Sequence, residues 1–280
     1  MIPATENFLQ SADAAATDTV PFSAVVVTYN DARHLAECLQ ALKFCRDLVV
    51  VDMGSTDRSL EIAASANARI FHKPRVPTVE MIREESLTHA THDWVVLVDP
   101  DEILSDGVQA QLRQLIAEQP NLAAALLAWD FYFKGKLLRT TVWGMPKTKV
   151  FLVNRRRIIV TPNVHQPMRP LPGFVFVDLT KTNATARVRH EWVDSYGQFI
   201  EKHLRYIRIE GKSRYEAGGR FSWFQAVGRS GWELKRNLLD YRGLLGGPRG
   251  WFLSCFYAWY TWMAWLSLRR YQKQMAAARQ

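Results

Sequence analysis

The stretch "WVVLVDPDEIL", Trp94–Leu104, decides the fold class and points to a binding site. An apolar, β-branched run is followed at once by Asp99, Asp101 and Glu102, and Pro100 separates the two aspartates. A short, continuous apolar run predicts a strand buried on both faces, as in a parallel sheet. Ligands bind beyond the carboxyl ends of the strands in such sheets, so we expect these carboxylates to line a site.

Two earlier strands also end in polar residues. The run "FSAVVVTYN" ends in Thr28, Tyr29 and Asn30, and "DLVVVDMGSTD" reaches Asp52 and Ser55. Helical patterns separate these strands, and strand and helix alternate through about residue 120. The alternation predicts an α/β fold with a mostly parallel sheet flanked by helices. We expect the three polar clusters to converge on one crevice.

The pattern divides the chain into four regions. Residues 1–20 are expected to be a polar, disordered lead-in without the pattern of a signal peptide, and residues 21–120 are expected to be the ligand-binding half with the parallel sheet. Residues 121–190 contain strands and turns, which predict a mixed sheet that extends it. Residues 191–280 are predicted to be a helical extension that associates with the membrane.

Composition narrows the class of partner. The chain has 280 residues, 48% of them hydrophobic, and a net charge of +9, so it buries a sizeable core and favours an anionic partner. Its 3 cysteines form no CxxC pair, which is typical of a reducing compartment. The basic residues concentrate beside an apolar helix instead of alternating with aromatic residues, so we expect no nucleic acid.

The acidic residues have the chemistry of a phosphate-side metal site. Oxygen ligands such as Asp99 and Asp101 suit Mg²⁺ or Mn²⁺, which in turn binds phosphate oxygens. Taken alone, the triplet is more often a turn that caps the next helix, and that structural role is expected for Glu102. The carboxylate of Asp52 can accept a hydrogen bond from a base imide or a ribose hydroxyl. Pro100 stiffens the turn and fixes the relation of the two aspartates.

Six motifs now identify a family resemblance. In this order, "VVVTYND", "VVVDMGSTD" and "DWVVLVDPDE" resemble a family 2 glycosyltransferase of the GT-A fold. Further along, "VFLVNRR", "PNVHQPM" and "VRHEWVDSYGQFIEKHLRY" resemble the branch that includes bacterial lipopolysaccharide core glucosyltransferases. The resemblance covers about residues 22–210.

The resemblance implies an inverting transfer from a nucleotide-sugar donor, most often a UDP-sugar, with a divalent metal. Carried over by position, the resemblance implies a nucleotide pocket lined by Thr28, Tyr29 and Asn30, with a contact to the base at Asp52. It implies a contact to the diphosphate at Arg83. It also implies a ribose or metal contact at Asp99 and the principal metal ligand at Asp101. Ser55 is counted with the nucleotide-sugar-binding residues. The acceptor is expected to be a lipid-linked glycan of the cell envelope.

A general base must remove the proton of the acceptor hydroxyl, a contribution of about 10²–10⁴-fold. Its candidates are Asp130, His165, His190 and Glu191. We favour His165, because "PNVHQP" is a loop with a restricted backbone on the acceptor side, and we keep Asp130 as the second candidate. His190 is alternatively a third metal ligand beside Asp99 and Asp101.

Four residues depart from the family pattern. Met53 makes the base pocket less polar, and Glu84 replaces an asparagine that usually follows the arginine. Lys147 stands where relatives often have an aspartate, and Gln166 follows His165 where they usually have a glutamate. The last two departures leave the acceptor open.

The segment "WFLSCFYAWYTWMAWLSL", residues 251–268, carries no charge. Its Trp and Tyr residues run through the middle, whereas membrane spans place such rings at their ends. We expect it to lie in the membrane interface, with a true span and a soluble aromatic core as alternatives. The protein is then expected on the cytoplasmic face of the inner membrane, peripheral or monotopic. The alternative functions are a nucleotidyltransferase acting on a sugar phosphate and a non-catalytic membrane-associated scaffold.

Overall fold

The computed structural model describes residues 20–161, 168–182 and 185–278. Within them the chain forms two compact units, residues 1–130 with 147–190 and residues 131–146 with 191–280. The short segment 131–146, which we had grouped with residues 121–190, therefore belongs to the second unit.

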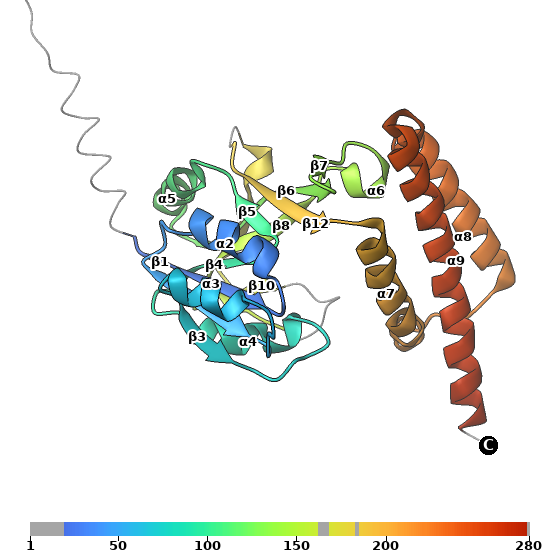
Figure 1. Ribbon diagram of the computed structural model, residues 1–280, viewed down its shortest axis with the longest axis horizontal. Helices are drawn as coiled ribbons and strands as arrows, with labels where there is room; N and C mark the ends of the chain where they lie inside the picture. The colour runs from blue at the N-terminus through green and yellow to red at the C-terminus, as the bar shows by residue number, and fades with distance from the viewer. Residues whose placement is uncertain (1–19, 162–167, 183–184, 279–280) are drawn as a thin grey trace, which may run out of the picture. The chain divides into compact units, whose positions relative to one another are not determined.

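The first half of the chain forms the predicted α/β pattern (Figure 1). Its elements are β1 (Phe22–Thr28), α2 (Ala32–Ala41), β2 (Asp47–Asp52), α3 (Ser59–Ser65), β3 (Arg69–His72), α4 (Glu80–Thr88), β4 (Trp94–Val98), β5 (Glu102–Leu104) and α5 (Val108–Glu118). Strands β3, β2, β1 and β4 lie side by side and are all parallel. The register places Thr28 opposite Asp52, so the polar ends of β1 and β2 are neighbours.

Later strands extend this sheet in mixed directions. They are β6 (Leu122–Phe133), β7 (Lys136–Leu137), β8 (Thr148–Asn154), β11 (Val175–Asp178) and β12 (Arg187–Val193), while β9 (Ile158–Ile159) and β10 (Arg169–Pro170) form a separate pair. The strand order is β3-β2-β1-β4-β8-β6-β12-β5, with β8 antiparallel to β4 and β12 antiparallel to β5. The predicted fold class, a mostly parallel sheet with a mixed extension, is confirmed.

Side-chain alternation along the strands separates two hydrophobic cores. Ala24 and Val26 face a core that includes residues of α2, α3 and α5, whereas Val25 and Val27 face a second core with residues of α4. Because successive side chains of a strand point to opposite faces, helices cover both faces of the sheet. This double cover fixes the strand ends, where the polar loops begin.

The second unit is mostly helical. Its helices are α6 (Thr141–Gly144), α7 (Tyr196–Glu216), α8 (Trp223–Lys235) and α9 (Gly247–Ala277). The rings of Trp143, Trp192, Phe199, His203 and Phe256 contact one another in the core of this unit. Among the helices that the structure describes, none combines the length and apolarity that crossing a bilayer requires.

Candidate functional site

The loops that follow β1 and β2 are bonded to each other. The backbone N–H of Asn30 donates to Oγ of Ser55 at 2.9 Å, and Oδ1 of Asn30 accepts from the backbone N–H of Thr56 at 2.7 Å. Asn30 has a φ of 57°, in the left-handed region that asparagine tolerates better than most residues. Two of the three predicted polar clusters thus form one joined rim.

Asp52 shapes its own loop. Its side chain is buried, with Oδ2 accepting from the backbone N–H of Gly54 at 3.0 Å and both oxygens accepting from that of Ser55 at 3.2 Å. The ring of His72 lies close, with Nδ1 3.6 Å from Oδ2. The sequence predicted only a ligand contact for Asp52. The Asp-x-Gly-Ser pattern could have indicated the structural role, because it is typical of an aspartate that accepts a hydrogen bond from the backbone N–H two residues further along.

Basic residues lie near the polar rim. The guanidinium of Arg75 stacks on the ring of Tyr29, 3.8 Å from its centre, a cation–π contact that the sequence analysis did not predict. Arg83, on α4, lies near enough to Asp99 to lower the pKa of that carboxyl. The hydroxyl of Thr28 is buried and has no hydrogen-bond partner among the described residues. These groups offer positive charge and a hydroxyl to an anionic ligand.

The acidic stretch after β4 forms a closed turn. The carbonyl of Asp99 accepts from the backbone N–H of Glu102 at 3.0 Å, and the backbone N–H of Asp99 donates to Oε2 of Glu102 at 2.8 Å. Pro100 occupies the second position of this four-residue turn, where its fixed φ is favoured. The expectation that Glu102 serves the next helix was wrong: its fully buried side chain folds back onto the turn.

Lys149 lies between two of these carboxylates. Its Nζ is 2.7 Å from Oδ2 of Asp99 and 2.6 Å from Oε1 of Glu102. Burial would raise the pKa of Asp99, but Lys149 and then Arg83 outweigh it and hold that pKa well below its usual range. Burial raises the pKa of Glu102 to about 8. The positive charge of Lys149 acts to lower this pKa and the negative charge of Asp99 acts to raise it, but burial has the largest effect.

Asp101 faces a different partner. Its Oδ2 lies 3.2 Å from Nε2 of His190, which comes from β12, and the indole of Trp129 stacks on the imidazole with ring centres 4.7 Å apart. A carboxylate oxygen and an imidazole nitrogen fit a divalent ion that takes its other ligands from a diphosphate and water. The pair does not form an all-protein metal site, because the described residues contain no group of three His, Cys, Asp or Glu placed to hold an ion.

Of the two predicted catalytic residues, the structure describes Asp130. Both oxygens of Asp130 accept from the guanidinium of Arg187, at 2.5 and 2.6 Å. An arginine that binds both oxygens occupies lone pairs that a base needs to accept a proton. His165 lies outside the described residues.

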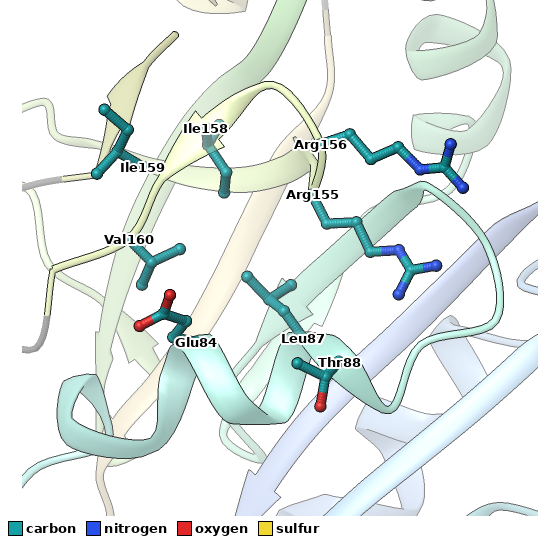
Figure 2. A pocket seen from close by; sticks show the side chains of 8 residues that line it. All are labelled: Glu84, Leu87, Thr88, Arg155, Arg156, Ile158, Ile159 and Val160. Carbon is teal, nitrogen blue, oxygen red and sulfur yellow. The ribbon is translucent and has the colours of Figure 1, made fainter.

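The pocket in Figure 2 is separate from the acidic turn. It has a volume of about 580 Å³ and is lined by the end of α4 and by residues 155–160, with Glu84 at one end and Arg155 and Arg156 at the other. Both arginines pair with Asp93, which precedes β4, whereas the acidic turn follows the other end of that strand. The predicted site residues therefore do not line this pocket.

Comparison with known proteins agrees with the motifs. Residues 23–228 match the family model of glycosyl transferase family 2. The chain is 25% identical over 214 residues to the lipopolysaccharide core biosynthesis glycosyltransferase LpsC of Rhizobium meliloti, covering 74% of this chain and 77% of LpsC. It is 31% identical over 106 residues to a TPR repeat-containing protein of Synechococcus elongatus, but spans only about a quarter (26%) of that relative's length.

Solved structures are similar over shorter parts. Glucosyl-3-phosphoglycerate synthase from Mycobacterium tuberculosis, in complex with Mg²⁺ and UDP, covers 56% of this chain and 62% of its own at 17% identity and a TM-score of 0.35. TarS of S. aureus covers 40% of this chain and 36% of its own at 23% identity and a TM-score of 0.35. The family match extends from β1 into α8, and with it the resemblance and the expected GT-A fold are confirmed. The chain belongs to glycosyl transferase family 2.

Proposed function

We propose that the protein is an inverting glycosyltransferase that moves a sugar from a UDP-linked donor to a lipid-linked glycan of the cell envelope, such as a lipopolysaccharide core. The convergence of the loops after β1, β2 and β4 carries the donor half of this proposal. Burial raises the pKa of Asp31, and the nearby carboxylates of Asp101, Asp57 and Asp99 add to that rise. Carboxylates from the three loops therefore lie near enough to one another to interact, which supports a shared site for a nucleoside diphosphate.

Mg²⁺ or Mn²⁺ would be held by Asp101 and His190, and would offset the negative charge that builds on the leaving diphosphate. The guanidinium groups of Arg75 and Arg83 add positive charge on the same side, and arginine binds phosphate with two parallel hydrogen bonds where geometry allows. Thr28, Tyr29, Asn30, Ser55 and Asp52 would shape the pocket for base and ribose. Asp99 would face the ribose while it keeps its ion pair with Lys149.

We assign the general base to His165 in preference to Asp130. The support for this choice is the ion pair of Asp130 with Arg187, in which both carboxylate oxygens already accept hydrogen bonds. His190, the other histidine of the predicted set, lies beside Asp101 and is taken as a metal ligand.

Charge and apolar exposure support a membrane-bound acceptor. The second unit carries 18 Lys and Arg against 7 Asp and Glu, a net charge of +11, whereas the first carries 18 against 20, a net charge of −2. Of the 17 large apolar side chains that the described residues expose, 14 belong to the second unit. Each basic residue near an anionic bilayer contributes about 1 kcal/mol. We therefore place the protein on the cytoplasmic face of the inner membrane.

Helix α8 presents the proposed membrane face. Its exposed apolar side chains are Trp223, Phe224, Val227 and Trp232, of which Phe224 is 89% exposed. The segment 251–268, which the sequence prediction assigned to the interface, lies in α9 and buries one side within its own unit, with Trp251 and Trp259 exposed on the other. An apolar face flanked by basic residues is typical of a helix that lies in the bilayer interface.

A donor screen tests the function. The full chain is incubated with Mn²⁺ and single UDP-sugars, with and without extracted cell-envelope lipid, and UDP release is measured. We expect release from one donor only when lipid is present, and a loss of at least about tenfold in Asp101→Asn. The matched control is Asp106→Asn, because Asp106 is an exposed aspartate five positions further along. Release of pyrophosphate in place of UDP would instead indicate the nucleotidyltransferase. Absence of both turnover and UDP binding would indicate the non-catalytic scaffold.

A further inference from the structure

Lys149 lies between Asp99 and Glu102, and Asp99 is one of the residues that the sequence analysis proposed as metal ligands. Its side chain is 19% exposed, and that of Glu102 has no exposure. Since Glu102 also bonds the backbone N–H of Asp99, the ammonium group connects both ends of the four-residue turn. The turn is therefore closed by a cation that belongs to the protein.

The surroundings of Lys149 stabilise its charged form. The carboxyl groups of Asp99 and Glu102 contact its Nζ and Asp101 lies near both, so negative charge at this turn is costly unless a cation offsets it. The rings of Trp129 and Phe151 lie 5.1 and 5.3 Å from Nζ, at cation–π distance. An ammonium group held on two sides by carboxylates and on two by aromatic rings has little freedom to leave.

We propose that Lys149 is a built-in cation that occupies the side of Asp99 where a metal ion would otherwise bind, and that among the described residues it leaves Asp101, with His190, to bind a divalent ion. Lys149 is thus a positioning residue, and Asp99 is not a metal ligand while the lysine is present. A divalent ion then binds weakly to the free protein and tightly only when the donor diphosphate supplies further oxygens. The inference rests on the proposed nucleotide-sugar site for the identity of that second ligand.

A variant without the ammonium group tests whether Lys149 keeps a divalent ion away from Asp99 or only stabilises the fold. In Lys149→Met the carboxyl groups of Asp99 and Glu102 lose their cation, and one oxygen of each is left facing the place that Nζ occupied, where a hard ion can bind. We expect the Kd for Mn²⁺ without nucleotide, measured by electron paramagnetic resonance of free Mn²⁺, to fall at least tenfold. Mn²⁺ should also raise the Tm of this variant more than that of the original protein.

Three further variants make the result specific. Lys147→Met removes the same charge two positions earlier, and should tighten Mn²⁺ binding much less. Lys149→Arg keeps the cation and should bind Mn²⁺ as the original protein does. The double variant Lys149→Met with Asp99→Asn should lose the gain, because the released ligand is gone. The proposal is overturned if Lys149→Met binds Mn²⁺ no more tightly than the original chain or if the double variant keeps the gain.

If Lys149→Met does not fold, single substitutions of Asp99 and Asp101 still test the proposal. At a UDP concentration that saturates each variant, Asp99→Asn should change the Kd for Mn²⁺ less than threefold, whereas Asp101→Asn should abolish Mn²⁺ binding. Equal loss in both variants would show that Asp99 is a ligand and would overturn the proposal. Failure of the original protein to bind UDP would instead count against the proposed function, and the nucleotide-free Mn²⁺ titrations would still decide the role of Lys149.

Discussion

The imidazole of His190 and the carboxylate of Asp101 lie with Nε2 and Oδ2 3.2 Å apart, although 89 positions separate the two residues in the chain. The antiparallel pairing of β12 with β5, which places His190 opposite Glu102, produces this contact. The stacked indole of Trp129 fixes the plane of the imidazole. An imidazole nitrogen and a carboxylate oxygen are thereby held together just after β4.

Removing the nitrogen ligand should weaken metal-dependent donor binding. For His190→Gln we expect the affinity for UDP in the presence of Mn²⁺ to fall about 10–100-fold, while binding of UDP without metal changes little. Calorimetric titration measures both values. His92→Gln is the matched control, because His92 precedes β4 at its other end. An unchanged affinity in His190→Gln would remove this histidine from the metal site.

Asp47 should make stability depend on pH. Burial would raise its pKa, but hydrogen bonds from Arg69, Thr91 and Ser23 lower the value from 3.8 to about 2. A carboxylate with a lowered folded-state pKa stabilises the fold fully above its unfolded-state pKa and loses that contribution as pH falls. We expect the free energies of unfolding of the original chain and Asp47→Asn, measured by urea denaturation, to differ at pH 6 by on the order of 1–2 kcal/mol and to converge between about pH 4 and 2.

Variants of the ion pair between Asp130 and Arg187 should show whether Asp130 has a structural or a catalytic role. If Asp130 only pairs with Arg187, then Asp130→Asn and Arg187→Gln should each lower the free energy of unfolding by about 1 kcal/mol, since Arg187 is largely exposed. Turnover should then stay within about tenfold of the original in both variants. A loss of about 10²–10⁴-fold in Asp130→Asn alone would mark it as the general base in place of His165.

The outward face of α8 should carry membrane binding. We expect Phe224→Ser with Val227→Ser to reduce co-sedimentation with vesicles that contain anionic lipid, because two exposed apolar side chains no longer enter the interface. Met81→Ser is the control, since Met81 is 53% exposed in the first unit. Added salt should weaken binding of the original chain through its basic residues. Equal co-sedimentation of both variants would place the contact elsewhere.

Gly211 should be essential to the packing of the second unit. A Cβ at this position of α7 would lie 2.4 Å from the carbonyl oxygen of Ser267 in α9, and backbone atoms cannot move aside as a flexible side chain can. We expect Gly211→Ala to lower the free energy of unfolding by about 1–3 kcal/mol. Gly231→Ala, in α8 with nothing within 4 Å of the added Cβ, should instead raise it by about 0.5–1 kcal/mol. Urea denaturation of both variants measures the difference.

The sequence predicted the parallel half of the sheet because its signal is local. Apolar runs such as residues 22–28 and 94–98 specify buried strands, and their polar ends specify the edge where ligands bind. The Asp-Pro-Asp-Glu turn was also readable, since proline at the second position is typical of a β-turn, but its closure by the side chain of Glu102 was missed. That closure depends on burial, which a four-residue pattern does not reveal.

Lys149 could not have been found in the same way. Within "TKVFLVN" a lysine at the start of a strand indicates an exposed position, and its partners stand 50 and 47 positions earlier. Only the antiparallel pairing of β8 with β4 brings them together. The same limit applies to segment 251–268, whose composition predicted an aromatic surface but not which rings its neighbours would bury.

The closed turn from Asp99 to Glu102 has a consequence for the entropy of binding. One backbone hydrogen bond, one bond from a backbone N–H to a side chain, a proline and a lysine fix this segment when the chain folds, before any ligand arrives. A loop that is already ordered loses little conformational freedom on association, so more of the contact energy remains as affinity. A donor that meets this turn should therefore bind with a smaller entropic penalty at the acidic corner than at loops that must still be ordered.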